Sequence, residues 1–346
     1  MATRWSSQAK PSTITVTVEE LLKNATVSYK AYLAVSGDLD EKRHALRRAI
    51  NDYDQAYSLV IQSPHKLRVT IAINYAAALD EQFKVPGERA GRNAIEVLSQ
   101  TVDDTQFRTP KSPLYPNLLD NLGQLYLNKY LEEKDGDALK SAREIFESNR
   151  VALHKTKGLL YNRALLGLAT FTCLRWESGS WPKRSYTMID ELRDAIGMMK
   201  LVLQDRNAEL QLACLEQLAI AHDFCYRQAS SSIKFNKPAP RNSPDLADLN
   251  KAVEYNSAAL QHAPDEAAAA PILVNLARQL FERHFKERSS DTFDLYEILE
   301  RVRDAEECIG QLGYSSSLRA LRDELIQLKD NIADYQRDKH ASISPN

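Results

Sequence analysis

Apolar residues along the chain recur at steps of three and four positions, with polar residues between them. This spacing is the period of an amphipathic α-helix, and every strong period in the chain is helical. Ala, Leu, Glu, Arg, Lys and Gln dominate the sequence, which holds only 11 Gly and 13 Pro. Few residues are therefore available for tight turns and hairpins, and we predict an all-α fold.

A small residue followed seven positions later by an aromatic one marks six segments, which we call the A helices. The pairs are Ala25 and Tyr32, Ala76 and Phe83, Gly123 and Tyr130, Ala169 and Trp176, Ala219 and Tyr226, and Ala277, with His284 in the aromatic position. Seven residues make two helical turns, so both members share one helix face, which suits a close helix crossing. We expect A helices near 18–35, 67–84, 116–132, 160–177, 208–228 and 267–287.

A second amphipathic segment follows each A helix after a polar gap of variable length, and we call it the B helix. Five of the six B helices carry an alanine near their start: Ala49, Ala94, Ala142, Ala195 and Ala252. Stacked pairs of this kind predict a right-handed α-solenoid of about six degenerate helix pairs across 18–312. Residues 1–17 have the composition of a disordered tail.

The last segment, 315–339, carries an apolar stripe at alternating three- and four-residue steps. Such a stripe can form the seam of a coiled coil, or it can cover the open end of a repeat array. We predict a capping helix, because the final repeat has no other apolar neighbour, and we keep the coiled coil as the alternative.

Two segments resemble long tetratricopeptide-type (TPR) repeats, as found in tandem arrays in fungal proteins. They are NLGQLYLNKYLEEKDGDALKSAREIFESN (121–149) and NLARQLFERHFKERSSDTFDLYEILERV (275–302). The resemblance covers about 18–310 and implies a protein-binding array. The repeats drift in length, and the basic residue that usually precedes the aromatic remains only as Lys129 and Arg283. The nucleotide-binding switch domain that often accompanies such arrays is missing, since the sequence has no G-x-x-x-x-G-K-[ST] motif.

Charge and cysteine content narrow the class of protein further. The net charge is −2, with 45 basic and 47 acidic residues interleaved along the chain, so we expect no nucleic-acid partner. The four cysteines are scattered without a Cys-x-x-Cys pair, which is typical of reduced core thiols. Neither a signal peptide nor a run of eighteen apolar residues is visible, so we expect no membrane segment and a cytoplasmic or nuclear location.

Motifs that would indicate an enzyme, a metal site or a cofactor site are missing, so we predict a non-catalytic protein without cofactor or metal. H-E-x-x-H, G-x-S-x-G and G-x-G-x-x-G do not occur. The alternative is a helical small-ligand receptor or enzyme with a pocket near Cys173, His222 and Cys225, because a thiolate–imidazole pair could act as a nucleophile. Buried packing residues of an A helix would show the same pattern.

A protein or peptide partner should bind along the A helices if these line the concave side of the array. The residues one helical step from the small position would then face the groove. They are Asp80, Glu81, Asp120, Gln124, Asn128, Arg163, Glu216, Asp223, Arg278 and Glu282. Acids outnumber bases in this set, which favours a basic or mixed apolar segment as the ligand, although a plain solvated wall would look the same.

Overall fold

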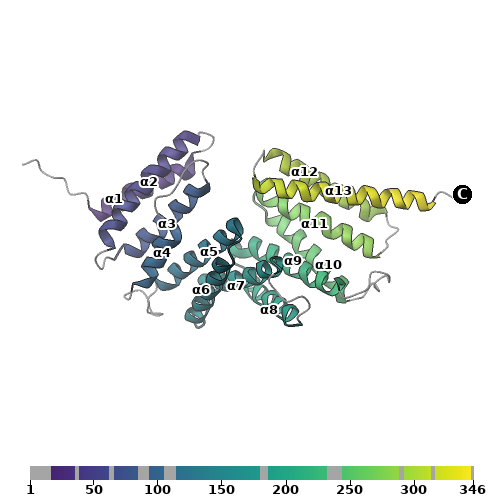
Figure 1. Cartoon of the computed structure of the whole chain (residues 1–346), viewed down its shortest axis with the longest axis horizontal. Helices are drawn as coiled ribbons and strands as arrows, with labels where there is room; N and C mark the ends of the chain where they lie inside the picture. Colours follow the sequence, from purple (N-terminus) through teal and green to yellow (C-terminus); the bar gives the residue numbers. More distant parts are fainter. Residues whose placement is uncertain are drawn as a thin grey trace, which may run out of the picture. The chain divides into compact units, whose positions relative to one another are not determined.

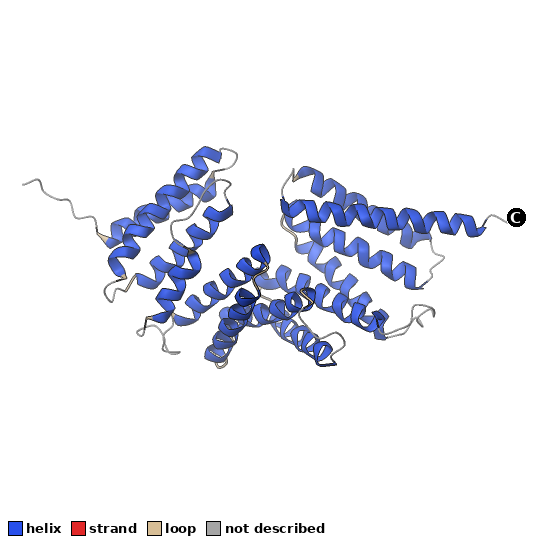
Figure 2. Cartoon of the chain, viewed as in Figure 1, coloured by secondary structure: helices blue, strands red, loops and turns tan. Residues whose placement is uncertain are grey.

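A computed structural model of the chain describes residues 17–35, 39–61, 66–84, 93–104, 114–179, 186–231, 244–287, 292–312 and 316–343. These ranges contain thirteen α-helices and no strand. Figure 1 labels the helices, and Figure 2 colours them blue. Consecutive helices pack in pairs, so the predicted all-α fold of six helix pairs and a C-terminal capping helix is confirmed. The predicted tail at 1–17 lies outside the described residues except for Thr17.

The chain divides into two compact units, residues 1–152 and 153–346. The first unit holds three helix pairs: α1 (Val18–Ala34) with α2 (Leu39–Val60), α3 (Arg68–Lys84) with α4 (Ala94–Asp103), and α5 (Tyr115–Glu133) with α6 (Gly136–Leu153). The second holds α7 (Leu159–Glu177) with α8 (Tyr186–Gln204), α9 (Ala208–Ser231) with α10 (Pro244–His262), α11 (Glu266–Glu287) with α12 (Thr292–Gln311), and α13 (Ser316–Ile343).

Several helices begin where a side chain satisfies the free amide groups of their first turn. Thr17 caps α1 through a capping box, in which its hydroxyl accepts from the Glu20 amide at 3.2 Å and the Glu20 carboxylate accepts from the Thr17 amide at 2.9 Å. Asn93 caps α4 and Asn207 caps α9 through their side-chain carbonyls. Polar residues ahead of an apolar stripe therefore fix where these helices start.

The small residue of every A helix is buried, as the repeat pattern predicts. Ala25, Ala169, Ala219 and Ala277 are fully inaccessible to solvent, and Ala76 and Gly123 are buried as well. The aromatic partners Tyr32, Tyr130 and Tyr226 are also buried, while Trp176 is half-buried and stacks on Phe224 with 4.0 Å between ring centroids. The side chain of Phe83 lies outside the described part. The small-plus-aromatic pattern thus marks the core-facing side of each A helix.

Gly123 shows why the small position has to be small. A Cβ atom at this residue would lie 2.8 Å from two ring carbons of Phe146, which is itself 1% exposed. Asn149 ties the same two helices together, because its amide donates to the Pro116 carbonyl at 3.1 Å. Helix α6 therefore packs on α5 at a distance that leaves no room for a side chain at Gly123.

The capping helix α13 lies beside α11 and α12, as Figure 1 shows for the yellow end of the chain. Leu325, Leu328 and Ile332 are buried in one apolar cluster with Val302 and Ile309 of α12. The heptad stripe is thus used within the chain. None of the described helices combines the length and the hydropathy that a membrane crossing requires.

Gly123→Ala should lower the free energy of unfolding by about 1–3 kcal/mol, because the added methyl group overlaps the Phe146 ring in a packed core. Gly197→Ala is the matched control. It is an exposed helical glycine with nothing within 4 Å of the added Cβ, so it should be neutral or stabilising by up to about 1 kcal/mol. Denaturant unfolding followed by circular dichroism measures both, and equal effects would contradict the packing described.

Replacing Leu325 and Leu328 together by Asp should uncover the apolar surface of α12 and make the protein oligomerise. Ile326→Asp on the same helix should leave the mass unchanged, because Ile326 is 58% exposed. Size-exclusion chromatography with light scattering measures the mass of each. A wild-type dimer that the double substitution converts into a monomer would support the coiled coil instead.

Candidate functional site

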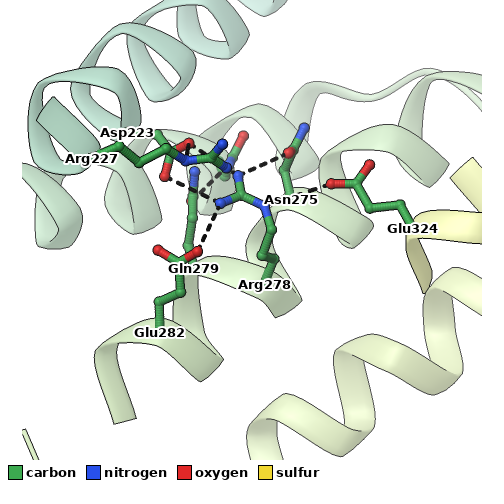
Figure 3. A network of polar contacts seen from close by, with 8 residues as sticks. Asp223, Arg227, Asn275, Arg278, Gln279, Glu282 and Glu324 are labelled. Atoms are coloured by element: carbon green, nitrogen blue, oxygen red, sulfur yellow. Dashed lines mark hydrogen bonds and ion pairs between the residues drawn. The ribbon is translucent and has the colours of Figure 1, made fainter. Parts of the chain in front are cut away.

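A network of charged side chains joins three helices of the second unit, with Arg278 at its centre (Figure 3). Arg278 of α11 donates to Asp223 of α9 at 3.1 and 3.4 Å and to Glu282, one turn further along α11, at 3.3 Å. Glu324 of α13 approaches the Arg278 Nε at 3.7 Å, and Arg227 of α9 pairs with Asp223 at 2.9 Å. The network therefore joins α9, α11 and α13 through one guanidinium group.

The network is largely removed from water. The Asp223 side chain is 3% exposed and that of Arg278 is 15% exposed. Burial alone would lower the pKa of Arg278, but Asp223 and Glu282 outweigh it, and its pKa lies above the ordinary value. Burial raises the pKa of Glu282; the Arg278 charge offsets this rise only in part, and the Asp223 charge adds to it. Three carboxylates face two guanidinium groups here, so one negative charge is left over.

Amide side chains complete the surroundings of Arg278. Asn275 accepts a hydrogen bond from the guanidinium at 3.2 Å, and Gln279 accepts one from the buried Asn256 of α10 at 2.9 Å. Gln279 and Asn256 are 1% and 3% exposed. The α9, α10 and α11 helices are thus joined by polar contacts as well as by their apolar faces.

Glu216 lies on α9 two turns before Asp223, so both carboxylates belong to the same face of that helix. It is half-buried, and burial raises the pKa of its carboxyl group. Within the described ranges no hydrogen bond or ion pair reaches it. Glu216 is therefore a partly dehydrated carboxylate on an A helix with no cation beside it.

The structure thus brings together three of the ten predicted groove residues, Asp223, Arg278 and Glu282, and places Glu216 nearby on α9. The same network also contains Arg227, Asn275 and Glu324. The repeat register, which selects residues by their distance from the small position, does not predict them. Arg227 and Asn275 carry no distinguishing sequence signal. Glu324 lies on the polar side of a heptad pattern that indicates only which residues are apolar.

The other predicted residues make contacts with neighbouring helices or with each other. Arg163 of α7 pairs with Glu209 of α9, and the Gln124 amide donates to Asn128 at 3.2 Å. In the first unit Glu81 accepts a hydrogen bond from the Tyr32 hydroxyl at 2.8 Å.

Two acids of the predicted set lie deeper than a groove wall requires. Asp120 is buried, with 7% of its surface exposed, and Asp80 is half-buried. Asp120 in particular offers almost no surface to a partner. Asp223 of α9 is buried as deeply, whereas Gln124 of α5 is exposed and Asn128, Arg163, Glu216 and Glu282 are half-buried.

His222, the centre of the alternative site, bonds to a carboxylate that lies in α10. Its Nδ1 is 2.7 Å from Asp248, which also accepts two hydrogen bonds from Arg193 of α8 at 2.8 and 2.5 Å. Burial opposes ionisation of Asp248, but the hydrogen bonds from His222 and Arg193 bring its pKa below the ordinary value. The His222 ring stacks on Tyr255 at 5.6 Å between centroids. This arrangement joins α8, α9 and α10.

The two thiols near His222 are unsuited to nucleophilic chemistry. Burial and the neighbouring Cys225 raise the pKa of Cys173 to about 12, and burial raises that of Cys225 to about 11. Both belong to one apolar cluster, and neither hydrogen-bonds to His222. Both therefore remain protonated near neutral pH. In the described ranges no three His, Cys, Asp or Glu side chains are grouped to hold a metal ion.

No family model matches the chain, and no curated protein matches it either. Solved structures of helical proteins do resemble it. One, titled "The hypoxic regulator of sterol synthesis Nro1 is a nuclear import adaptor", has a TM-score of 0.45 and 13% identity over 88% of this chain and 93% of the other. A structure of the S. pombe nuclear import adaptor Nro1 has a TM-score of 0.44 and 12% identity, over 88% and 97%.

A circular tandem repeat protein with a novel repeat topology is also similar, with a TM-score of 0.29 and 17% identity over 92% of this chain and 78% of the other. All of these neighbours are built from helical repeats. Resemblance at these scores is too low to assign a function or a repeat class, and the TPR assignment stays a prediction.

Arg278→Met should lower the free energy of unfolding by about 3 kcal/mol, because it leaves buried Asp223 with a single, half-exposed partner, Arg227. Arg303→Met is the matched control. Arg303 is 69% exposed and pairs only with acids of its own helix, so less than about 1 kcal/mol should be lost. Chemical unfolding of both variants gives the difference, and similar losses would mean that Arg278 does not hold the network together.

Proposed function

We propose that this chain is a non-catalytic scaffold that binds a protein or peptide segment along its A helices. The binding surface is the face of α9 and α11 that carries the half-buried Glu216 and Glu282 beside the buried Asp223–Arg278 pair, and we call it the α9–α11 face. We also propose that the helix pairs are degenerate TPR-type repeats, and that the protein acts in the cytoplasm or nucleus.

The observation that carries this proposal is the placement of two half-buried carboxylates, Glu216 and Glu282, on the α9–α11 face. Burial raises the pKa of both Glu216 and Glu282. A carboxylate that is partly dehydrated and not fully neutralised gains when a cation replaces its missing water. A basic side chain from a partner would supply that cation, so the proposed ligand is a segment that combines Lys or Arg with apolar residues.

The length of the charged face suits an extended segment. Glu216 and Arg227 are eleven residues apart on α9, which corresponds to about 16 Å at the rise of an α-helix. An extended peptide covers that distance with about five residues. The binding energy would come from a few ion pairs and apolar contacts, without bond-breaking chemistry.

A short peptide that alternates Arg and Leu tests the proposal, with a Glu–Leu peptide as its charge-reversed counterpart. The basic peptide should bind the full chain in fluorescence polarisation, more weakly as salt rises, and the acidic one should not. Glu216→Lys should weaken binding about tenfold, since a repulsive charge replaces an attractive one.

Glu307→Lys is the matched control, because Glu307 is an exposed acid of α12 and takes no part in the network around Arg278. It changes the net charge by the same amount and should alter binding less than about twofold. Equal losses in both variants would show nonspecific charge attraction. Affinity capture from native lysate with the wild type, Glu216→Lys and Glu307→Lys then shows which bound proteins depend on Glu216.

A further inference from the structure

A cavity of about 360 Å³ lies within the second unit, at the turn between α8 and α9. It is lined by Val202, Leu203, Arg206, Asn207, Leu210, Gln211 and Leu215. This volume is within the range of small-molecule sites, at its lower end. The cavity is distinct from the charged network around Arg278, none of whose residues lines it.

The cavity has an apolar body. Val202, Leu210 and Leu215 are at least nine-tenths buried, and Leu203 is half-buried. Leu215 continues into an apolar cluster with Ala259 of α10 and Ile272 of α11. A ligand that entered between these side chains would therefore bury hydrocarbon, at roughly 25 cal/mol for each Å² taken from water.

The polar side of the cavity offers two donor groups, from Arg206 and Asn207. The Arg206 side chain makes no hydrogen bond or ion pair with any described residue, so its guanidinium group is available; only its backbone amide is bonded, to the Leu203 carbonyl at 3.1 Å. Asn207 uses its carbonyl oxygen to accept from the Glu209 amide at 3.0 Å, which leaves its NH₂ group as a donor. Gln211 is held to His262 of α10 at 2.9 Å. No carboxylate lines the cavity.

The acids nearest in sequence contact side chains of α7, and within the described residues neither forms an ion pair with Arg206. Asp205 accepts a hydrogen bond from Asn162 at 2.6 Å, and Glu209 pairs with Arg163. The first turn of α9 adds its own positive end to the same place. The cavity therefore joins an apolar interior to a rim that carries the Arg206 guanidinium group.

We propose that this cavity binds a small carboxylate with an apolar chain, of the class of medium-chain fatty acids. The chain would lie among Val202, Leu203, Leu210 and Leu215, and the carboxylate would accept hydrogen bonds from Arg206 and Asn207. The volume equals that of about twelve water molecules at roughly 30 Å³ each, which suits about ten non-hydrogen atoms in a partly open site.

Octanoate is the probe, and isothermal titration calorimetry with the full chain is the measurement. It should bind with a dissociation constant on the order of 0.1–1 mM, and 1-octanol, which has the same chain without the charge, about tenfold more weakly. Arg206→Gln should weaken octanoate binding about tenfold and leave octanol unchanged. Absence of binding at millimolar octanoate, or equal affinity for acid and alcohol, would overturn the proposal.

Lys157→Gln is the matched control. Lys157 has the same left-handed backbone conformation after a helix, with φ 42° against 48° for Arg206, but it does not line the cavity. The Lys157→Gln variant should bind octanoate as the wild type does. A loss of octanoate affinity equal to that of Arg206→Gln would overturn the proposal.

A photoreactive octanoate analogue locates the site independently of affinity. Crosslinked peptides should map to residues 202–215, and labelling elsewhere would overturn the assignment. A short peptide with a C-terminal Leu should bind no more tightly than octanoate. Binding that is much tighter and equally dependent on Arg206 would assign the cavity to the end of a polypeptide chain and overturn the small-molecule proposal.

Discussion

Close helix crossings at small residues are the constraint on which the rest of this structure depends. An amphipathic helix buries its apolar face only if a neighbour comes near enough to exclude water, and side chains at the crossing set that distance. Each A helix has alanine or glycine there, and a larger residue seven positions later fills the space beside it. Because dispersion attraction falls steeply with distance, a wider crossing would weaken every contact along the pair.

The charged residues of the second unit follow from the same stacking. Once α9 and α11 are fixed in register, Asp223 and Arg278 meet with little water around them, and removing either one would leave the buried charge of the other only partly compensated. A shift of one turn between the helices would separate the pair. We infer that the ion pair adds little net stability but selects one alignment of these helices. Glu216 and Glu282, on the same two helices, are the carboxylates of the proposed binding face.

The fold could be predicted from the sequence because its signals are local. A 3.6-residue period, a small residue and an aromatic two turns later lie within one helix, so they need no knowledge of the neighbours. The same register selected Asp223, Arg278 and Glu282, which the structure brings together. The position of a residue on its helix was sufficient for these three.

Contacts between distant segments could not be predicted in this way. The sequence places His222 one helical turn from Cys225 and so suggests a pair of these two residues. The hydrogen-bond partner of His222 is instead Asp248, which lies 26 residues later on α10. The cavity at Arg206 also depends on how α8 and α9 meet at their turn. Neither arrangement has a periodic signal in the sequence. Each depends on the angle at which two helices pack, and the apolar period of a single helix does not contain that information.

The contact between Gly123 and the Phe146 ring has a consequence for how such a chain diverges. The two positions form a complementary pair, so a larger residue at 123 is tolerated only together with a smaller one at 146. A helix pair fitted to its own partners in this way loses interchangeability with its neighbours. Duplicating or exchanging the segment that contains α5 without α6 would introduce a mismatch, although consensus repeat units can be exchanged freely. The unequal repeat lengths are therefore those of an array whose units have become individually fitted and no longer modular.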